Sequence, residues 1–256
     1  MTATESSPPA LSVIIPAYNE EKRLGATLLA IEEYCRTRGV AAEILVVNDG
    51  STDATARLAR AFAARQPVRV LENPGNRGKG YSVRHGMMAA RGRELLFTDA
   101  DLSAPIAEVE KLRAALAAGA DIAIGSRARR ELLRARQSRW RETAGHLFHW
   151  VVVALLGLRF ADTQCGFKLF RREAAAAIFP LQRIERWGFD PELLFIARRQ
   201  GWRVAEVPVI WSHAEGAKIH LLRDGARMFL DVLRIRLNAW CGRYRAAPEQ
   251  RAASIA

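Results

Sequence analysis

The chain has 256 residues, half of them hydrophobic, which suits one sizeable α/β domain with a buried core. Its 39 Lys and Arg residues outnumber its 27 Asp and Glu residues, and the net charge of +12 predicts an anionic partner: nucleic acid, a phosphate-bearing substrate or an acidic membrane surface. The three cysteines are too widely spaced for a metal-ligand pair, and no apolar run reaches the roughly 18 residues that a spanning helix needs. We therefore expect a protein that does not cross a membrane by itself but can lie on one.

Short runs rich in Val, Ile and Leu alternate with helical patterns through the first half of the chain. We expect strands over residues 11–17, 43–49, 68–73, 94–100 and 121–126. We expect helices over residues 20–39, 51–66, 78–92 and 104–119. Continuous apolar strands that alternate with helices predict an α/β fold, with a mostly parallel sheet covered by helices on both faces.

Polar side chains follow three of the expected strands. Tyr18 and Glu20 come after the first strand, Asp49 after the second, and Asp99 and Asp101 after the fourth. Ligands of such sheets bind at the carboxyl ends of the strands. We therefore expect these five residues to face one crevice.

Two aspartates, separated by one alanine, end the apolar run "LLFTDADLSAP". In an extended segment, residues two apart point to the same side, so Asp99 and Asp101 suit Mg²⁺ or Mn²⁺ carrying nucleotide phosphates. The alternative is a capping turn, in which Asp101 or Ser103 caps a helix that starts at Pro105.

Two further segments suggest a nucleotide site. Asp49 in "VVNDGSTD" can accept the N–H of a uracil or guanine edge, and Tyr18 can stack on the base, although Asp49 can equally be a turn residue. The glycine-rich "NPGNRGKGYS", which contains Lys79, opens a helix and can hold an anion. Its spacing matches neither the P-loop nor the dinucleotide-binding pattern.

Arginines and apolar segments dominate the second half. Seven arginines lie between residues 127 and 141, an apolar segment covers 147–160, and a helix over about 219–240 carries an apolar stripe. The stripe consists of Leu222, Ala226, Phe229, Leu230, Leu233, Leu237 and Trp240. Basic residues beside apolar segments predict contact with lipid phosphate and anionic headgroups, and the alternative is a solvated basic face.

The motifs together resemble a known family. "LSVIIPAYNE", "ILVVNDGSTD", "NRGKGYSVRHG" and "TDADLS" look like the nucleotide-sugar half of family 2 glycosyltransferases with the GT-A fold. "DTQCGFKLFRR", "WGFDPELLFIA" and "EVPVIWSHAEGAKI" resemble dolichyl-phosphate β-glucosyltransferases and their bacterial relatives. The resemblance implies inverting transfer of a hexose, with UDP-glucose as the expected donor, to dolichyl or polyprenyl phosphate. It further implies a Mg²⁺ or Mn²⁺ cofactor and a peripheral position on the cytoplasmic face of a membrane.

The resemblance also implies roles for single residues. The nucleotide sugar would contact Pro16, Tyr18, Glu20, Asp49, Lys79 and Asp99, with the base at Tyr18 and Asp49 and the ribose at Asp99. The metal would bind Asp101 and Asp99, and related mannosyl enzymes often have a glutamine ligand where this chain has Ser103. The catalytic residues would be Asp101, Asp190 and Arg127.

The acceptor site follows from the chemistry of phosphate. Guanidinium groups bind phosphate bidentately, so the candidates for the acceptor phosphate are Arg127, Arg139 and Lys168. A phosphate monoester is mostly dianionic at neutral pH and is already a nucleophile. Asp190 therefore need not act as a base and can instead contact sugar hydroxyls or hold the acceptor loop. We expect Asp162 to order that loop and Cys165 to pack rather than react.

The expected domain organisation has five segments: a disordered lead-in over 1–10, a nucleotide-sugar half over 11–126, an acceptor half over 127–217, an amphipathic interfacial helix over 218–241 and a tail over 242–256.

Three other functions are kept as alternatives. A mannose synthase that uses GDP-mannose is the rival within the class. A nucleic-acid-binding protein would suit the sequence pI of about 10.5, but no aromatic-interleaved reading surface or helix-turn-helix pattern is present, so we expect no nucleic-acid partner. A nucleotidyltransferase would not explain the arginines and apolar stripes of the second half.

Overall fold

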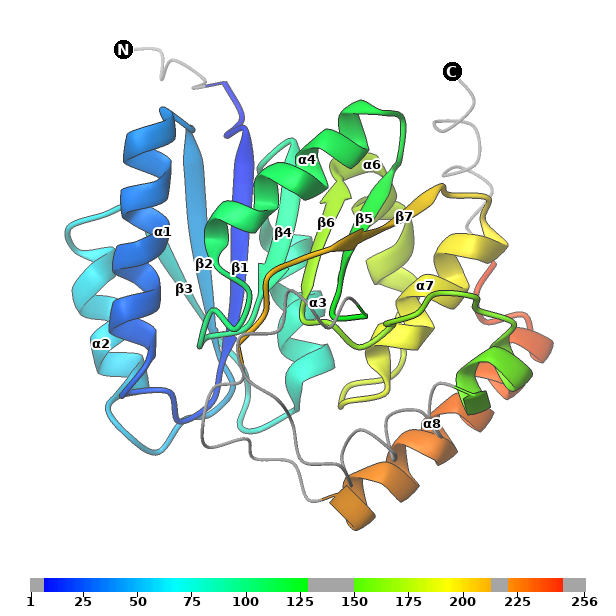
Figure 1. Cartoon of the computed structure of the whole chain (residues 1–256). Coiled ribbons are helices and arrows are strands. Elements are labelled where there is room, and N and C mark those ends of the chain that lie inside the picture. The colour runs from blue at the N-terminus through cyan, green and yellow to red at the C-terminus, as the bar shows by residue number, and fades with distance from the viewer. Residues whose placement is uncertain (1–6, 129–149, 213–220, 246–256) are drawn as a thin grey trace, which may run out of the picture.

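The computed structural model describes residues 7–128, 150–212 and 221–245 (Figure 1). Within these residues seven strands form one sheet in the order β3-β2-β1-β4-β6-β5-β7. The strands are β1 (Leu11–Ala17), β2 (Ala42–Asn48), β3 (Val68–Glu72), β4 (Glu94–Thr98), β5 (Ile122–Ser126), β6 (Phe167–Arg171) and β7 (Val204–Pro208). The pairs are parallel except those that β6 makes with β4 and β5. The predicted mostly parallel sheet is confirmed.

Helices cover both faces of the sheet (Figure 1). They are α1 (Leu24–Arg38), α2 (Thr55–Ala63), α3 (Lys79–Ala89), α4 (Val109–Ala117), α6 (Arg172–Ile178), α7 (Phe189–Arg199) and α8 (Leu221–Trp240), with short 3-10 turns at Ile106–Glu108 and Phe179–Leu181. Successive residues of a strand point to opposite faces. Val13 and Ile15 therefore pack with α1, α2 and α4, whereas Ile14 packs with α3, α6 and α7.

The strand β6 was not predicted. It is five residues long, and a lysine interrupts its apolar pattern, so neither alternation nor a continuous apolar run marked it as a strand. Lys168 is nevertheless fully buried in the sheet. Because β6 pairs with β4, the expected nucleotide-sugar and acceptor halves share one sheet, and their division into separate units stays a prediction.

The helix α8 runs below α7, on the side where the parallel strands end (Figure 1). Its buried face is formed by Val232, Ile235 and Ala239, which join the core on the α3 side of the sheet. Five residues of the predicted stripe are 40% to 89% exposed and do not belong to this buried face: Phe229, Leu230, Leu233, Leu237 and Trp240. Among the described helices, none is long and apolar enough to span a bilayer.

Candidate active site

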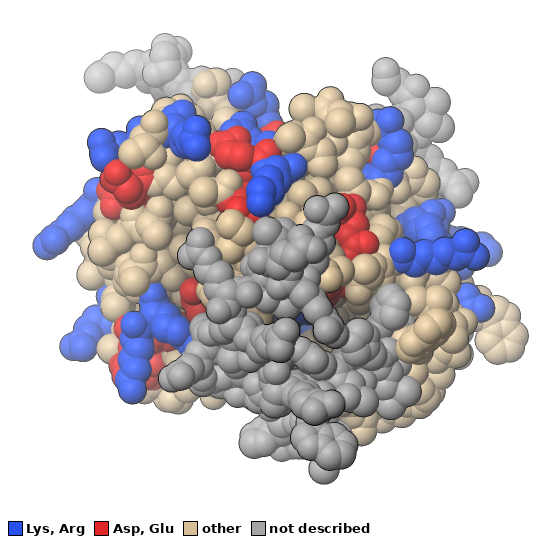
Figure 2. All heavy atoms as spheres, in the orientation of Figure 1, with Lys and Arg blue, Asp and Glu red and all other residues tan. Residues whose placement is uncertain are grey.

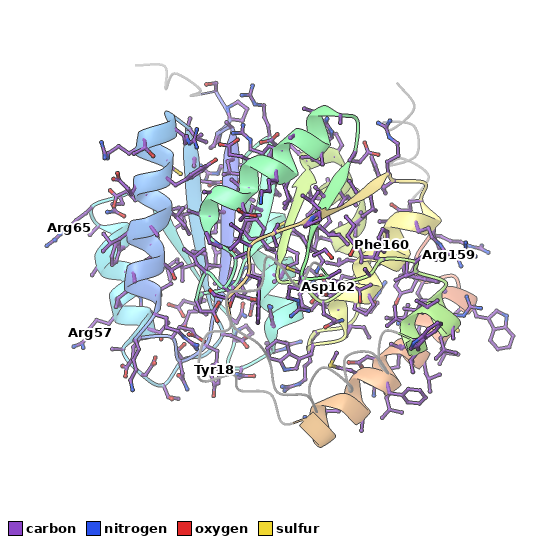
Figure 3. All side chains as sticks on the ribbon, viewed as in Figure 1. Tyr18, Arg57, Arg65, Arg159, Phe160 and Asp162 are labelled. Atoms are coloured by element: carbon purple, nitrogen blue, oxygen red, sulfur yellow. The ribbon has the colours of Figure 1, made fainter. Side chains whose placement is uncertain are left out.

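The ends of β1 and β2 form one side of the candidate site. The pairing of β1 with β4 ends at Ile14, and Pro16 lies beyond that point. The missing N–H of Pro16 therefore costs no hydrogen bond to β4. Tyr18 is partly exposed and lies below the carboxyl ends of the strands (Figure 3). Glu20 accepts a hydrogen bond from Arg23 Nε (2.7 Å), and its N–H donates to Thr55 Oγ1 (2.7 Å). These bonds fix the loop that follows β1.

The Asp49 carboxylate fastens the glycine-rich loop. Its Oδ1 accepts bonds from Asn73 Nδ2 (2.8 Å) and the Arg77 N–H (2.9 Å), and its Oδ2 accepts one from the Gly78 N–H (2.8 Å). The residue is buried. Asp49 therefore acts as the loop-holding residue that was one of the two alternatives from the sequence. The other alternative, contact with a nucleotide base, stays a prediction.

Asp99 and Asp101 lie on a turn rather than on an extended segment, so that part of the prediction was wrong. The strand ends at Thr98, and the Leu102 N–H donates to Asp99 O (3.1 Å), which closes the turn. The Asp101 Oδ1 atom accepts bonds from the N–H (3.0 Å) and the Oγ (2.9 Å) of Ser103. Neither residue caps the next helix, which begins after Pro105 with no side-chain cap.

The two carboxylates still share one electrostatic environment. Asp99 Oδ1 lies 2.5 Å from the ammonium of Lys79, the first residue of α3, and Asp101 Oδ2 lies 3.9 Å from Arg23 Nη1. Burial alone would lower the pKa of Lys79, but the carboxylates of Asp99, Asp190 and Asp101 outweigh it and hold that pKa above its usual range. Three carboxylates thus act electrostatically on one ammonium, and one of them, Asp99, contacts it.

This arrangement fits a hard divalent cation. The side chains of Asp99 and Asp101 are 36% and 21% exposed, and a lysine ammonium already lies against one of them. No group of three or more His, Cys, Asp or Glu side chains suited to a metal occurs among the described residues. Mg²⁺ usually binds one or two carboxylates together with substrate phosphates, and the pair suits this mode.

The loop before β6 packs directly on Asp99. A Cβ atom added to Gly166 would overlap Asp99 Oδ2 and approach both other atoms of that carboxyl group. Only glycine leaves room for this contact. The glycine of the "DTQCGFK" motif therefore joins the second half of the chain to the turn after β4.

Asp190 and Lys168 form a buried ion pair. The Lys168 ammonium contacts Asp190 Oδ1 and donates to Cys165 O (2.6 Å), and Asp190 lies in the first turn of α7. Burial raises the pKa of Asp190, against the opposing effect of the Lys168 and Lys79 ammonium groups. Lys168 has no exposed surface, so a contact with acceptor phosphate would require it to leave Asp190.

Arg127 and Asp162 form a bidentate pair. Arg127 Nε lies 2.6 Å from Asp162 Oδ2 and its Nη2 lies 2.9 Å from Oδ1, while the Arg127 N–H also donates to Oδ2 (3.0 Å). Burial would raise the pKa of Asp162, but Arg127 holds it at about 2. The Gln164 N–H donates to the same carboxylate (3.0 Å), which confirms that Asp162 orders this loop (Figure 3).

Two other sequence expectations have different outcomes. Cys165 is buried in the core on the α1 side of the sheet, which confirms that it packs there, and burial raises the pKa of its thiol to about 12. Arg139 lies outside the described residues. Sequence reasoning missed Trp187, whose ring lies 5.4 Å from the Lys79 ammonium; its place in "WGFDPE", three residues before Asp190, was the available signal.

Comparison with known proteins identifies the family. The family model described as glycosyl transferase family 2 matches residues 12–179. A dolichyl-phosphate beta-glucosyltransferase of Drosophila melanogaster is 42% identical over 249 residues, which cover 90% of this chain and 76% of that protein. Proteins of the same name from Mus musculus and Saccharomyces cerevisiae are 39% and 36% identical, and the matches cover 94% and 92% of this chain and 79% and 76% of those proteins.

Solved structures show the same fold. The crystal structure of glucosyl-3-phosphoglycerate synthase from Mycobacterium tuberculosis, in complex with Mn²⁺, UDP-glucose and phosphoglyceric acid, has a TM-score of 0.69 at 22% identity, over 91% of this chain and 80% of that one. The complex of that enzyme with Mg²⁺ and UDP has a TM-score of 0.66 at 21% identity, over 91% of this chain and 80% of that one. The expected GT-A fold is confirmed. The chain is a glycosyltransferase and belongs to glycosyl transferase family 2.

Proposed function

We propose that the protein transfers glucose from UDP-glucose to dolichyl phosphate or another polyprenyl phosphate, with inversion at the anomeric carbon. The observation that carries this proposal is the identity of 35% to 42%, over most of the chain, with proteins named dolichyl-phosphate beta-glucosyltransferase. The geometry supports it, because Asp99, Asp101, Lys79 and Asp190 meet at the carboxyl ends of the strands.

The donor diphosphate would lie beside the Asp99–Asp101 turn. Asp101, with Asp99, would hold Mg²⁺ or Mn²⁺, which when bound neutralises charge on the departing nucleotide. Lys79 and Arg23 contribute fixed positive charge next to the same carboxylates. In this proposal Tyr18 would stack on the base and Asp99 would accept a ribose hydroxyl.

The acceptor phosphate would approach from the opposite side of the sugar. It is already dianionic at neutral pH, so no side chain has to remove a proton from it. We assign Asp190 to the hydroxyls of the sugar and Lys168 to holding Asp190 in place, since the lysine is buried. Asp162 holds Arg127 through Nε and Nη2, and in this proposal the remainder of the guanidinium would bind the phosphate.

A donor panel tests the function. Purified protein is incubated with radiolabelled UDP-glucose or GDP-mannose and detergent-solubilised polyprenyl phosphate, with and without EDTA, and label is counted in the organic extract. We expect label from UDP-glucose only, and its loss with EDTA. Label from GDP-mannose alone would establish the mannose synthase alternative, whereas filter binding of RNA without any transfer would favour the nucleic-acid alternative.

We propose further that the exposed face of α8 lies on the membrane that carries the acceptor, at its cytoplasmic surface. The face presents Phe229, Leu230, Leu233, Leu237 and Trp240. Arg227, Arg234 and Arg236 are exposed on the same helix, and Figure 2 shows further Lys and Arg side chains along both flanks of the view. Apolar side chains with neighbouring arginines suit the interface of an anionic bilayer.

Vesicle flotation tests this docking. We expect the protein to float with vesicles of phosphatidylcholine and phosphatidylserine, and more weakly with phosphatidylcholine alone. Leu237→Glu should lower the affinity for vesicles at least about tenfold, because burial of a leucine is worth about 1.5–3 kcal/mol. Leu29→Glu, at an exposed leucine of α1, is the matched control and should bind as the wild type does. Equal binding of both variants would contradict the docking face.

A further inference from the structure

One buried carboxylate has no role in the proposed reaction. Glu192 lies in α7 and has no exposed surface. Its Oε1 accepts hydrogen bonds from the Tyr244 hydroxyl (2.6 Å) and the Arg183 N–H (3.0 Å), and its Oε2 accepts one from the Ile184 N–H (2.8 Å). Glu192 therefore joins the segment after α8 to the loop between Leu181 and Phe189.

That loop supports the first turn of α3. The Tyr81 N–H donates to Glu185 O (2.9 Å), and Gln182 Nε2 donates to Gly80 O (2.8 Å). A Cβ atom on Gly78 or Gly80 would lie 2.7 Å from a carbonyl oxygen of this loop. Only glycine at these two positions lets the loop pack this closely against the turn. The turn contains Lys79, the partner of Asp99, and the loop also carries Trp187 next to the Lys79 ammonium.

The other side of the connection leads to α8. Asn238 Nδ2 donates to the Tyr244 oxygen (3.2 Å), and Asn238 Oδ1 accepts a bond from Arg243 Nη1 (2.9 Å). At a second point, a Cβ atom on Gly188 would lie 2.5 Å from Asp231 Cβ, so α8 packs closely against the end of the same loop. The helix with the exposed apolar face is thus fastened to the loop that supports Lys79.

We propose that Glu192 and Tyr244 are positioning residues of the donor site, which hold the 182–187 loop, and through it Lys79, in the geometry that binds the nucleotide sugar. The inference rests on the proposed function. It assigns to the segment after α8 an indirect part in donor binding, because the Tyr244 hydroxyl is connected to α3 through the Glu192 side chain and the 182–187 loop.

The charge of Glu192 is part of this arrangement. Burial raises its pKa to about 7, helped by the neighbouring Asp231 and opposed by the Tyr244 hydroxyl and the amides of Ile184 and Arg183. The ionised form accepts all three donors, and protonation below about pH 7 removes acceptor capacity. Because the folded pKa lies above that of an exposed glutamate, the neutral form stabilises the fold at acid pH, and this contribution is lost as the pH rises through about 7.

A pair of tyrosine variants tests the inference. Tyr244→Phe removes the hydroxyl from Glu192, and Tyr34→Phe is the matched control, because the buried Tyr34 donates to Glu110 Oε1 at the same 2.6 Å but joins α1 to α4. We expect Tyr244→Phe to raise the KM for UDP-glucose about fivefold at nearly unchanged kcat, by loss of roughly one hydrogen bond to a charged group. Hydrogen exchange at the Arg183 and Ile184 amides should become faster, and Tyr34→Phe should change neither quantity.

The pH dependence gives a readout that general destabilisation does not. The protection factors of the 182–187 amides in the wild type should rise as the pH falls from about 8 to 6, because the closed loop holds the pKa of Glu192 above its value in the opened loop, and they should be flat in Glu192→Gln. Unchanged exchange in Tyr244→Phe, or an equal rise of KM in Tyr34→Phe, would overturn the inference. If the wild type transfers no glucose, the proposed function fails by itself. The positioning roles of Glu192 and Tyr244 are then decided by the UDP affinities of the wild type and Tyr244→Phe, measured by calorimetry, together with the exchange data.

Discussion

Asp101→Asn should lower kcat/KM for glucose transfer by at least about 100-fold. A loss of this size is typical when a metal site loses part of its charge or a transition state loses a stabilising group. The amide oxygen of asparagine can still accept the bonds from the Ser103 N–H and Oγ, so the turn after β4 should persist. What disappears is the negative charge beside Asp99. Initial rates with UDP-glucose at varied Mn²⁺ concentration measure the loss, which excess metal should restore only in part.

Asp121→Asn serves as the control for this variant. Asp121 precedes β5, at the amino ends of the parallel strands and so at the opposite end of the sheet from Asp101, and it accepts a hydrogen bond from the Arg203 N–H (2.8 Å) that an amide oxygen can also accept. Its kcat/KM should stay within about twofold of the wild type. Wild-type activity of Asp101→Asn would remove the basis for a metal at the Asp99–Asp101 turn.

Lys168→Met should destabilise the fold by about 3–5 kcal/mol, because removal of the lysine leaves the charge of Asp190 buried and unpaired. Asp190 is 2% exposed, and burial already raises its pKa while Lys168 is present. Without the lysine, the carboxyl group must become protonated or expose itself to water. Urea unfolding at neutral pH measures the loss of free energy.

A double variant and a surface variant separate the causes. Lys168→Met combined with Asp190→Leu removes both charges and should recover most of the lost stability without recovering transfer. Lys111→Met removes a half-exposed lysine from its pair with Glu108, which keeps the bond from the Ile210 N–H (2.9 Å), and should cost no more than about 1 kcal/mol. A cost for Lys168→Met as small as that for Lys111→Met would show that the buried pair contributes little.

The first half of the fold was predictable from local pattern. Each of its five strands is a compact run of Val, Ile and Leu, bounded by polar or turn residues, so periodicity located them to within two residues. The second half was harder. The strand β6 has a lysine at its second position, and the carboxylate on α7 that pairs with Lys168 is 22 residues away in the sequence.

The candidate site shows the same limit. The sequence located Asp99 and Asp101 but not the turn between them, which depends on the left-handed conformation of Leu102 (φ 45°). The pair formed by Lys79 and Asp99 arises from the packing of α3 against the sheet. The contact of Tyr244 with Glu192 spans 52 residues, and no local pattern encodes such a distance.

The antiparallel strand β6 has a consequence for synthesis of the chain. It lies between β4 and β5, although about 70 residues separate it from β4 along the chain, and at about 5–20 residues per second the ribosome needs several seconds to make them. During that time the backbone N–H and C=O groups along one edge of β4 have no strand beside them, and such an edge is a template for pairing between chains. A nascent chain halted before residue 167 should therefore depend on chaperones more strongly than one in which β6 has left the ribosome and pairs with β4.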